Sequence, residues 1–329
     1  MTRFVLKRLI GAVLVLFALS VLVYGLFYVL PGNPAQIACG EKCTPAQVAQ
    51  VRERLGLDEG VWAQYAHFLG GLFTGRDYSA GVGVLHCDAP CLGLSYKNGQ
   101  PVTAMIVEKL PATASLALGA LVVWTVVGVG TGLLSAVRRG GLTERALTVV
   151  TLAATGMPVF ILGLLLMMAV CAYLEWLPFP SYVGLTEDPE QWAWNMLLPW
   201  VTLGFFESAK YARLTRSSTL ETLAEDHIRT FRAYGVGERA VVARHALRGA
   251  FPPVIALSAY DLGTMFGGAV LTERLFNIPG LGNALITGVR QVDLPVVVGV
   301  VMLLGVAVVL ANVLADVLYA VADRRVVLA

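Results

Sequence analysis

The chain has 329 residues, of which 57% are hydrophobic and 14% are charged, and its mean hydropathy is +0.72. This composition excludes an ordinary soluble enzyme and is typical of a polytopic membrane protein. The net charge of +2 identifies no class of partner, and the arginines are scattered at the edges of apolar segments, which argues against a nucleic-acid surface.

The first apolar segment covers residues 9–30 and contains no charged residue. Crossing a hydrocarbon core takes about 20 residues, so the segment is long enough to span a membrane. Basic residues precede it, as in a signal peptide, but the apolar region of a signal peptide is shorter, at about 7–15 residues. We therefore predict an uncleaved first transmembrane helix over residues 1–30, which Pro31 and Gly32 end.

Residues 31–112 are predicted to form an external segment with structure of its own. Thr44 followed by Pro45 is a typical helix start, and Gly56 is a typical helix end. A second helix over residues 61–73 is rich in aromatic residues. Its aromatic side chains fit the outer membrane interface, or alternatively contact with a substrate-delivering protein.

Four of the five cysteines lie in this segment, as the pairs Cys39 with Cys43 and Cys87 with Cys91. An external segment is in an oxidising compartment, so we predict disulfides that join one pair to the other. The sequence does not choose between the two possible cross-pairings. A four-thiolate metal site is the alternative, although zinc sites usually have tighter CxxC spacing. The preferred interpretation assigns no metal site to the chain.

Two further spans are predicted over residues 112–137 and 145–174, and the second is interrupted at Gly156, Met157 and Pro158. A proline in a membrane helix leaves a backbone carbonyl free, which a neighbouring helix or a water-filled cavity must satisfy. Pro158 is therefore a candidate residue of a substrate path. Simple kinking of the helix is the alternative.

Three more apolar segments bring the number of predicted spans to six: residues 196–214, 251–271 and 296–320. The fourth span contains Glu207 and the fifth contains Asp261. A charge at the centre of a span costs roughly 2.5–3.5 kcal/mol, so both carboxylates should face the bundle interior or a water-filled path. The alternative is polar packing, in which Lys210 pairs with Glu207 three residues earlier on the same helix.

The basic residues indicate the orientation of the six spans. Lysine and arginine are abundant at the amino terminus, after the second span and in the loop at residues 220–253, whereas the loop between the third and fourth spans has none. Basic loops stay in the cytoplasm. Both termini and the loop at residues 220–253 are therefore predicted to be cytoplasmic.

The loop at residues 220–253 is the longest polar stretch on the cytoplasmic side. A short helix is predicted from Glu225 to Tyr234. Ile228, Phe231 and Tyr234 lie three apart, so their side chains project from roughly one face of this helix. Gly235 then releases the chain from that helix. The helix is too short and too polar to span a membrane, and its apolar face needs a partner.

The same loop resembles the EAA loop of permease subunits in binding-protein-dependent ABC importers. Arg229-Thr230-Phe231 is followed by Gly235 and, after nine more residues, by the run HALR from His245, a form similar to the oligopeptide and dipeptide branch. Phe231 departs from the pattern because a small residue is usual there, and Tyr234 stands where lysine is common.

The resemblance implies that this helix docks in a groove of a separate ATP-hydrolysing subunit, and a solvated loop is the alternative. The residues to which it assigns this contact are Glu225, Asp226, Ile228, Arg229, Thr230, Phe231, Arg232, Ala233, Tyr234 and Gly235.

Other blocks in order along the chain, FYVLPGNPA, GQPVTAMIVEKLPAT, LFNIPGLG and ADVLYAVADRR, extend the resemblance over nearly its full length and point to the B-type permease of a peptide importer. The resemblance implies an all-α membrane protein with six transmembrane helices of the type I ABC importer permease kind and a core at residues 113–322. It also implies a bacterial inner-membrane complex with lipid around it, containing a second homologous permease, two ATP-binding subunits and an extracytoplasmic substrate-binding protein.

The chain carries no signal for ATP hydrolysis. A phosphate-binding loop needs a lysine after a glycine-rich turn, and none of the five lysines follows a glycine. We therefore predict that the chain is not an enzyme and holds no cofactor, and that the partner subunits bind ATP and magnesium. Two alternative functions remain: a permease of the same family for nickel or another small solute, and a proton-coupled secondary transporter that uses Glu207 and Asp261.

Overall fold

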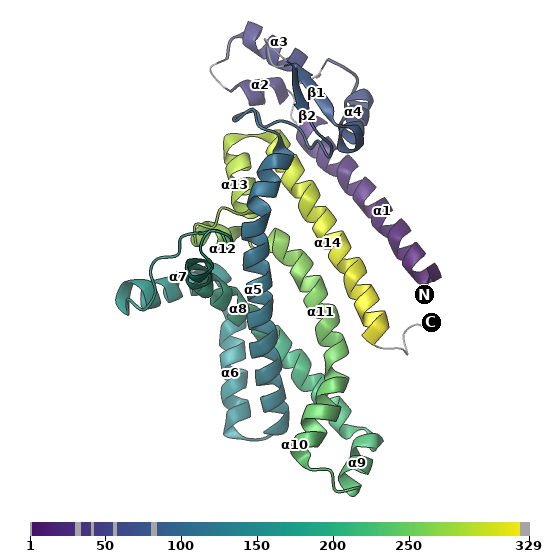
Figure 1. The fold of residues 1–329 in the computed structure, drawn as a ribbon, viewed down its shortest axis with the longest axis vertical. Helices are drawn as coiled ribbons and strands as arrows, with labels where there is room; N and C mark the ends of the chain where they lie inside the picture. The colour runs from purple at the N-terminus through teal and green to yellow at the C-terminus, as the bar shows by residue number, and fades with distance from the viewer. Residues whose placement is uncertain (1, 30–33, 41–42, 55–57, 80–83, 323–329) are drawn as a thin grey trace.

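The structure is a computed structural model that describes residues 2–29, 34–40, 43–54, 58–79 and 84–322. The molecule is elongated and almost entirely helical, with a small folded segment at one end and the short helices α9 and α10 at the other (Figure 1). A two-stranded antiparallel sheet is present, so the expectation of an all-α fold was wrong in this one detail.

Three helical segments in the described residues are long and apolar enough to cross a membrane: Leu6–Tyr28, Val102–Val137 and Leu294–Leu318. The first combines α1 (Thr2–Tyr24) with a π-helical continuation (Gly25–Val29). The other two are α5 (Val102–Val137) and most of α14 (Leu294–Ala322). They correspond to the predicted first, second and sixth spans. Pro31 and Gly32, the expected end of the first span, lie outside the described residues.

The segment that follows the first helix contains five short elements: α2 (Pro34–Cys39), α3 (Pro45–Arg54), α4 (Val61–Thr74), β1 (Arg76–Ser79) and β2 (Val84–Cys87). Thr44 begins α3 as predicted, because the Gln47 side chain accepts from the Thr44 N–H at 2.8 Å while Thr44 Oγ1 accepts from the Gln47 N–H at 3.4 Å. The predicted end at Gly56 lies outside the described residues.

The four cysteines of this segment form the disulfides Cys39–Cys43 and Cys87–Cys91, so the predicted cross-pairing was wrong. A spacing of four residues brings the Cα atoms to 5.9 and 5.6 Å, within the range that a disulfide bridges. No group of three or more potential metal ligands occurs among the described residues, and the thiolates of the alternative metal site are consumed by the two bonds.

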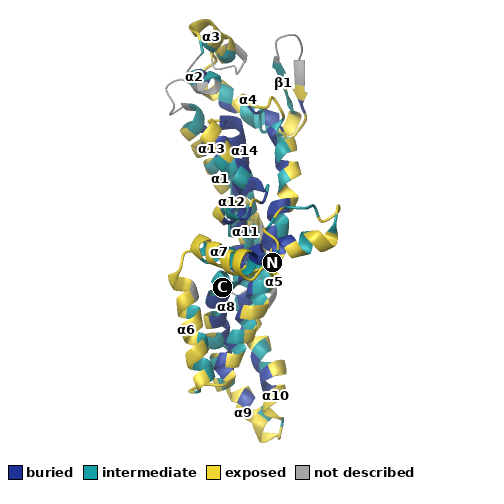
Figure 2. Cartoon of the chain, turned by 90° about the vertical axis from the view of Figure 1, so that its left-hand side faces the viewer, coloured by how far each residue is buried: buried dark blue, intermediate teal, exposed yellow. Residues whose placement is uncertain are grey.

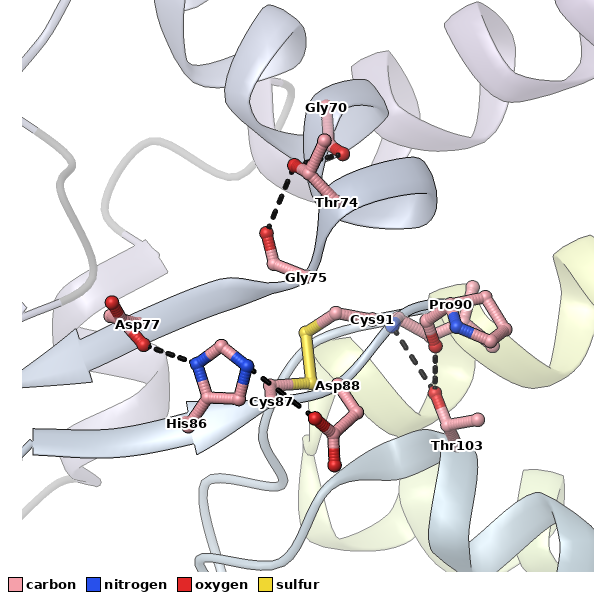
Figure 3. Close-up of a disulfide and its surroundings, with 11 residues drawn as sticks. Gly70, Thr74, Gly75, Asp77, His86, Cys87, Asp88, Pro90, Cys91 and Thr103 are labelled. Carbon is pink, nitrogen blue, oxygen red and sulfur yellow. Dashed lines mark hydrogen bonds and ion pairs between the residues drawn. A yellow bond between two sulfur atoms is a disulfide. The ribbon is translucent and has the colours of Figure 1, made fainter.

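The Cys87–Cys91 disulfide fastens the end of β2 to the rest of the segment (Figure 3). Both cysteines are buried, and the Cys91 N–H donates to the Gly71 carbonyl of α4 at 3.0 Å. A Cβ at Gly75, where φ is +78°, would lie 2.7 Å from the Cys87 carbonyl oxygen. The turn between α4 and the hairpin therefore requires glycine.

The membrane core is built around the close packing of α5 on α8 (Pro189–Ala224). Trp124 of α5 and Tyr211 of α8 are fully buried, with ring centroids 6.1 Å apart. A Cβ at Gly128 would lie 2.4 Å from Tyr211 Cβ, and one at Gly132 would lie 2.5 Å from the Ala212 carbonyl oxygen. Helix α5 begins at Val102, earlier than the predicted span, and continues through Pro111.

The predicted third span is two helices and not one. Helix α6 (Leu142–Gly156) runs along the long axis, whereas α7 (Val159–Met167) and its π-helical continuation (Met168–Tyr173) lie across it (Figure 2). Pro158 is the N-cap of α7 and Met157 has extended backbone angles. The proline therefore ends one helix and starts another in a new direction, instead of kinking a continuous span.

The remaining helices complete the core and the loop predicted to be cytoplasmic: α9 (Asp226–Ala233), α10 (Glu238–Ala240), α11 (Leu247–Gly268), α12 (Val270–Leu275) and α13 (Leu281–Gln291). A π-helical stretch (Val241–Ala246) joins α10 to α11, and α11 packs along α14. The predicted fourth and fifth spans fall in α8 and α11, which are not among the three segments with the length and apolar composition of a span.

The glycines of α5 provide a test of the α5–α8 packing. We expect Gly132→Val to lower the thermal stability of the purified complex, by about 1–3 kcal/mol in free energy of unfolding, because the new side chain overlaps α8. The matched control is Gly130→Val, since a Cβ at Gly130 meets no atom within 4 Å. Equal thermal unfolding of the two variants in detergent would contradict the packing.

The disulfides provide a second test. We expect replacement of Cys87 and Cys91 by alanine to loosen residues 84–101, at a local cost of about 2 kcal/mol for so short a loop. Hydrogen–deuterium exchange would measure this as faster exchange of the Cys91 amide, which is bonded to Gly71. The control is the Cys39→Ala, Cys43→Ala variant, which should leave that amide protected.

Candidate functional site

The loop at residues 220–253 contains a short helix, α9, that is packed on its own chain. Glu225 is the N-cap of α9 and Tyr234 is its C-cap, so the predicted bounds of the helix are confirmed. The Val236 N–H donates to the Phe231 carbonyl at 3.1 Å and Gly235 has φ of +78°. This left-handed glycine ends the helix and turns the chain toward α10.

The apolar face of α9 is already occupied within the chain. Ile228 is fully buried, and the Phe231 ring stacks on the His245 ring with centroids 3.9 Å apart. Phe231, the departure from the family pattern, therefore serves to hold α9 against the start of the next long helix. Tyr234, the third member of the predicted apolar face, is 83% exposed.

The outer face of α9 combines charge with one aromatic ring. Asp226 and Arg229 form an ion pair at 3.3 Å and remain 94% and 74% exposed. Arg232 pairs with Glu238 of α10 at 2.6 Å. The Arg232 hydrogen bond holds the pKa of the Glu238 carboxyl below its ordinary value, and the Glu238 carboxylate raises the pKa of Arg232. The exposed residues of this face are Asp226, Arg229, Thr230, Arg232, Ala233 and Tyr234.

A second cluster joins α8 to α11 inside the predicted membrane region. Lys210 Nζ lies 2.7 Å from Glu207 Oε2 and 2.9 Å from Asp261 Oδ2, and the Tyr211 hydroxyl donates to Asp261 at 2.9 Å. The pairing of Glu207 with Lys210 is confirmed. Local spacing does not indicate the contact of Lys210 with Asp261, which lies on a different helix.

Exposure differs within this cluster. The side chain of Asp261 is 6% exposed and that of Glu207 is 14% exposed, whereas that of Lys210 is 41% exposed. One lysine therefore pairs with two carboxylates, and its side chain is the most exposed of the three. Pro158, the third candidate of the path, is exposed at the break between α6 and α7 and lies in no polar cluster.

Three further polar contacts were missed because they join residues distant in the sequence. Arg216 of α8 pairs with Glu144 of α6 in a short ion pair. The fully buried Glu273 carboxylate accepts from Thr113 Oγ1 at 2.6 Å and from the Asn283 N–H at 2.9 Å. At the other end of α13, buried Asp293 accepts from the Ser95 hydroxyl at 2.5 Å. Each contact satisfies a carboxylate that local spacing leaves unpaired.

Family models match both parts of the chain. Residues 1–117 match the model of the N-terminal part of binding-protein-dependent transport system membrane components. Residues 128–328 match the model described as binding-protein-dependent transport system inner membrane component. The chain belongs to this family of transport-system permeases. It is accordingly a multi-pass protein of the inner membrane and a membrane component of a transport system.

Relatives in this permease family are similar to the chain over almost its whole length. A putative peptide transport system permease protein of Brucella abortus (strain 2308) is 36% identical over 326 residues, which covers 99% of each chain. The dipeptide transport system permease protein of Escherichia coli (strain K12) is 35% identical over 352 residues, again covering 99% of each.

A solved structure is similar to this permease in fold. The methionine ABC transporter MetNI in inward-facing conformations contains a chain that aligns with a TM-score of 0.54 at 19% identity, covering 68% of the present chain and 99% of that chain. At this identity the likeness concerns the fold alone. Helices of an ABC importer permease and the helices of this chain therefore share an arrangement.

The shared lysine provides a test of the membrane cluster. We expect Lys210→Met to lower the free energy of unfolding by about 1–3 kcal/mol, because Glu207 and Asp261 lose their common cation. The loss should stay below the about 3–5 kcal/mol of a fully buried pair, since the lysine is half exposed. Thermal unfolding of the purified complex measures the change.

A double variant serves as the control for this cluster. Adding Asp261→Asn to Lys210→Met removes one of the two stranded charges and should recover part of the lost stability. A Lys210→Met protein as stable as the unmodified one would show that the lysine does not hold the two carboxylates.

Proposed function

We propose that the chain is one of the permease subunits of an ATP-driven importer for di- or oligopeptides. The observation that supports this most is the similarity, over 99% of the chain, to peptide and dipeptide transport permeases. An external binding protein delivers the peptide, and this chain with a second, homologous permease encloses the path. Two separate subunits bind ATP with magnesium and supply the energy.

The membrane topology belongs to the same proposal. Six spans with both termini in the cytoplasm place the segment that holds the disulfides outside and α9 inside, and Figure 1 has these two parts at opposite ends of the molecule. The disulfides are consistent with this orientation, because they persist in an oxidising compartment. The fourth and fifth spans then consist of α8 and α11, in which Glu207 and Asp261 are both paired with Lys210.

The exposed apolar side of α6 and α7 is suited to contact with the second permease. Leu142 is 82% exposed, Val149 is 65% exposed and Phe160 is 46% exposed, and Figure 2 shows both helices largely uncovered. Large apolar areas of this kind mark interfaces with protein or lipid. Pro158 lies within this area. In the cluster of Glu207, Lys210 and Asp261, the lysine is the most exposed side chain. We propose that both line the path, the carboxylates acting through the lysine that they hold.

The coupling mechanism follows from the contacts of α9. Buried Ile228 and the stack of Phe231 on His245 fix α9 to the helix that continues into α11. When the ATP-binding subunits move α9, the motion passes to α11 and, through the Asp261–Lys210 contact, to α8. The core thereby alternates between inward-open and outward-open arrangements, which ATP binding populates differently.

The function is tested by reconstituting the full importer in proteoliposomes. We expect uptake of a dipeptide that requires ATP and the binding protein and that a pH gradient neither drives nor changes. Uptake driven by a pH gradient without ATP would indicate a proton-coupled transporter. ATP-dependent uptake of nickel but not of the dipeptide would assign the importer a different substrate.

The coupling surface yields a sharper test. We expect Tyr234→Asp to reduce ATP-driven uptake at least about tenfold without lowering thermal stability, because the exposed ring contributes contact area to the ATP-binding subunit. Phe231→Asp should instead destabilise the loop, since it breaks the stack on His245. The measurements are uptake, ATP hydrolysis and copurification of the ATP-binding subunits.

Two further variants make this test specific. Tyr234→Phe keeps the ring and should transport normally. Gly235→Val should also impair coupling, because a branched residue is strained at φ of +78° even though the surrounding space is open. Normal uptake per ATP hydrolysed in both Tyr234→Asp and Gly235→Val would rule out α9 as the docking helix.

A further inference from the structure

A polar cavity of about 200 Å³ lies between α5, α13 and the start of α14. One water molecule needs only about 10–15 Å³, so the cavity has room for several water molecules or for part of a solute. Figure 1 shows α13 beside the end of α5 that is next to the disulfide-bonded segment, at the opposite end of the molecule from α9. The cavity is therefore on the side from which a substrate would arrive.

The carboxylates of Asp293 and Glu273 hold the walls of the cavity in place, and they already accept hydrogen bonds from neighbouring groups. Both oxygens of buried Asp293 are occupied, by the Ser95 hydroxyl at 2.5 Å and the Tyr96 N–H at 3.0 Å. Asn283 donates its backbone N–H to Glu273 and accepts from Arg274 at 3.2 Å. These contacts fix the loop before α5 and both ends of α13, which is the rigidity that a preformed binding site needs.

The other polar side chains of the cavity are uncommitted. In the part of the chain that the structure describes, Asn98, Lys109, Thr287 and Gln291 make no side-chain hydrogen bond or ion pair. Lys109 is half buried, and its ammonium offers three donors. The side-chain amides of Asn98 and Gln291 offer hydrogen-bond donors and acceptors to the same cavity. Lys109 is half buried, whereas Asn98, Thr287 and Gln291 are exposed; all four line one cavity, where a ligand can supply partners for them.

A cation beside two amides is complementary to a carboxylate followed by a peptide group. The ammonium pairs with the carboxylate, and the amides satisfy the N–H and C=O next to it. The satisfied Asp293 carboxylate does not compete for Lys109 as an ion-pair partner, because its oxygens bind Ser95 and Tyr96. The charged end of a peptide carries this combination of groups.

We propose that this cavity receives the C-terminal end of the transported peptide, with Lys109 on the terminal carboxylate and the amides of Asn98 and Gln291 on the adjoining peptide group. The proposal rests on the proposed function, since it names a contact for the substrate of that importer. It places selection for a free C-terminus within the permease itself, as a consequence to be tested, after the binding protein has released the peptide.

The test measures protection of a cysteine placed in the cavity wall. Thr287→Cys is introduced into the full importer in proteoliposomes and labelled with a membrane-impermeant maleimide. The dipeptide alanyl-alanine, in excess over the binding protein, should slow the labelling at least about tenfold, whereas alanyl-alanine amide should not. The native cysteines contribute little background, because four form disulfides and Cys171 is buried.

Three variants make the result specific. Val289→Cys lies on the same helix but does not line the cavity, and its labelling should not respond to the dipeptide. Combining Thr287→Cys with Lys109→Gln should abolish the protection, and combining it with Lys109→Arg should retain it. The comparison distinguishes loss of the positive charge from a general effect on folding.

The outcomes also separate this inference from the function on which it rests. Equal protection by the dipeptide and its amide, or none by either, overturns the inference even if the same liposomes show ATP-driven dipeptide uptake. Absence of uptake by the unmodified complex overturns the proposed function, whatever the labelling shows. Protection that persists in Lys109→Gln also overturns the assignment of the lysine.

Discussion

The architecture depends on the close contact between α5 and α8. Gly128 and Gly132 leave no room for a Cβ against Tyr211 and Ala212, so the two backbones approach closely enough to bury Trp124. Small residues at helix interfaces permit this approach in membranes, where hydrophobic association between helices is weak. With α8 held in this way, its other faces are directed to α6 and α11.

Charged residues in the core act as connections between these helices. Lys210 links α8 to α11, Arg216 links α8 to α6, and Glu273 links the segment after α11 to α5. Each charge has a partner, which is what removal from water requires. The pairings also provide a continuous mechanical route: α9 is fixed to the helix leading into α11, and α11 is fixed to α8. A displacement of α9 is therefore passed to the helices that we propose to line the path.

The two ends of the molecule differ in how they are held. The loop that holds α9 is packed on its own chain through Ile228 and the ring stack of Phe231 on His245, and it leaves Tyr234 exposed. The outer end relies on covalent and buried polar links, including the Cys87–Cys91 disulfide and the contact of Ser95 with Asp293. A loop fixed only by packing transmits motion to the core, and a rigid outer end keeps a preformed cavity in shape.

The sequence by itself determined the features that depend on local spacing and on the length of apolar runs. These include the apolar segments at the two ends of the chain, the bounds of α9 at Glu225 and Tyr234, and the pairing of Glu207 with Lys210 three residues away. The tertiary structure decided which distant groups meet: Asp261 as the second partner of Lys210, and His245 as the ring that stacks on Phe231. It also decided the new direction of α7 after Pro158. The disulfide pairing was decided in the same way, because only the folded chain shows which Cα atoms come within bridging distance, here 5.9 and 5.6 Å. Local periodicity determines which face a residue is on, but only the packing of separate elements determines what that face touches.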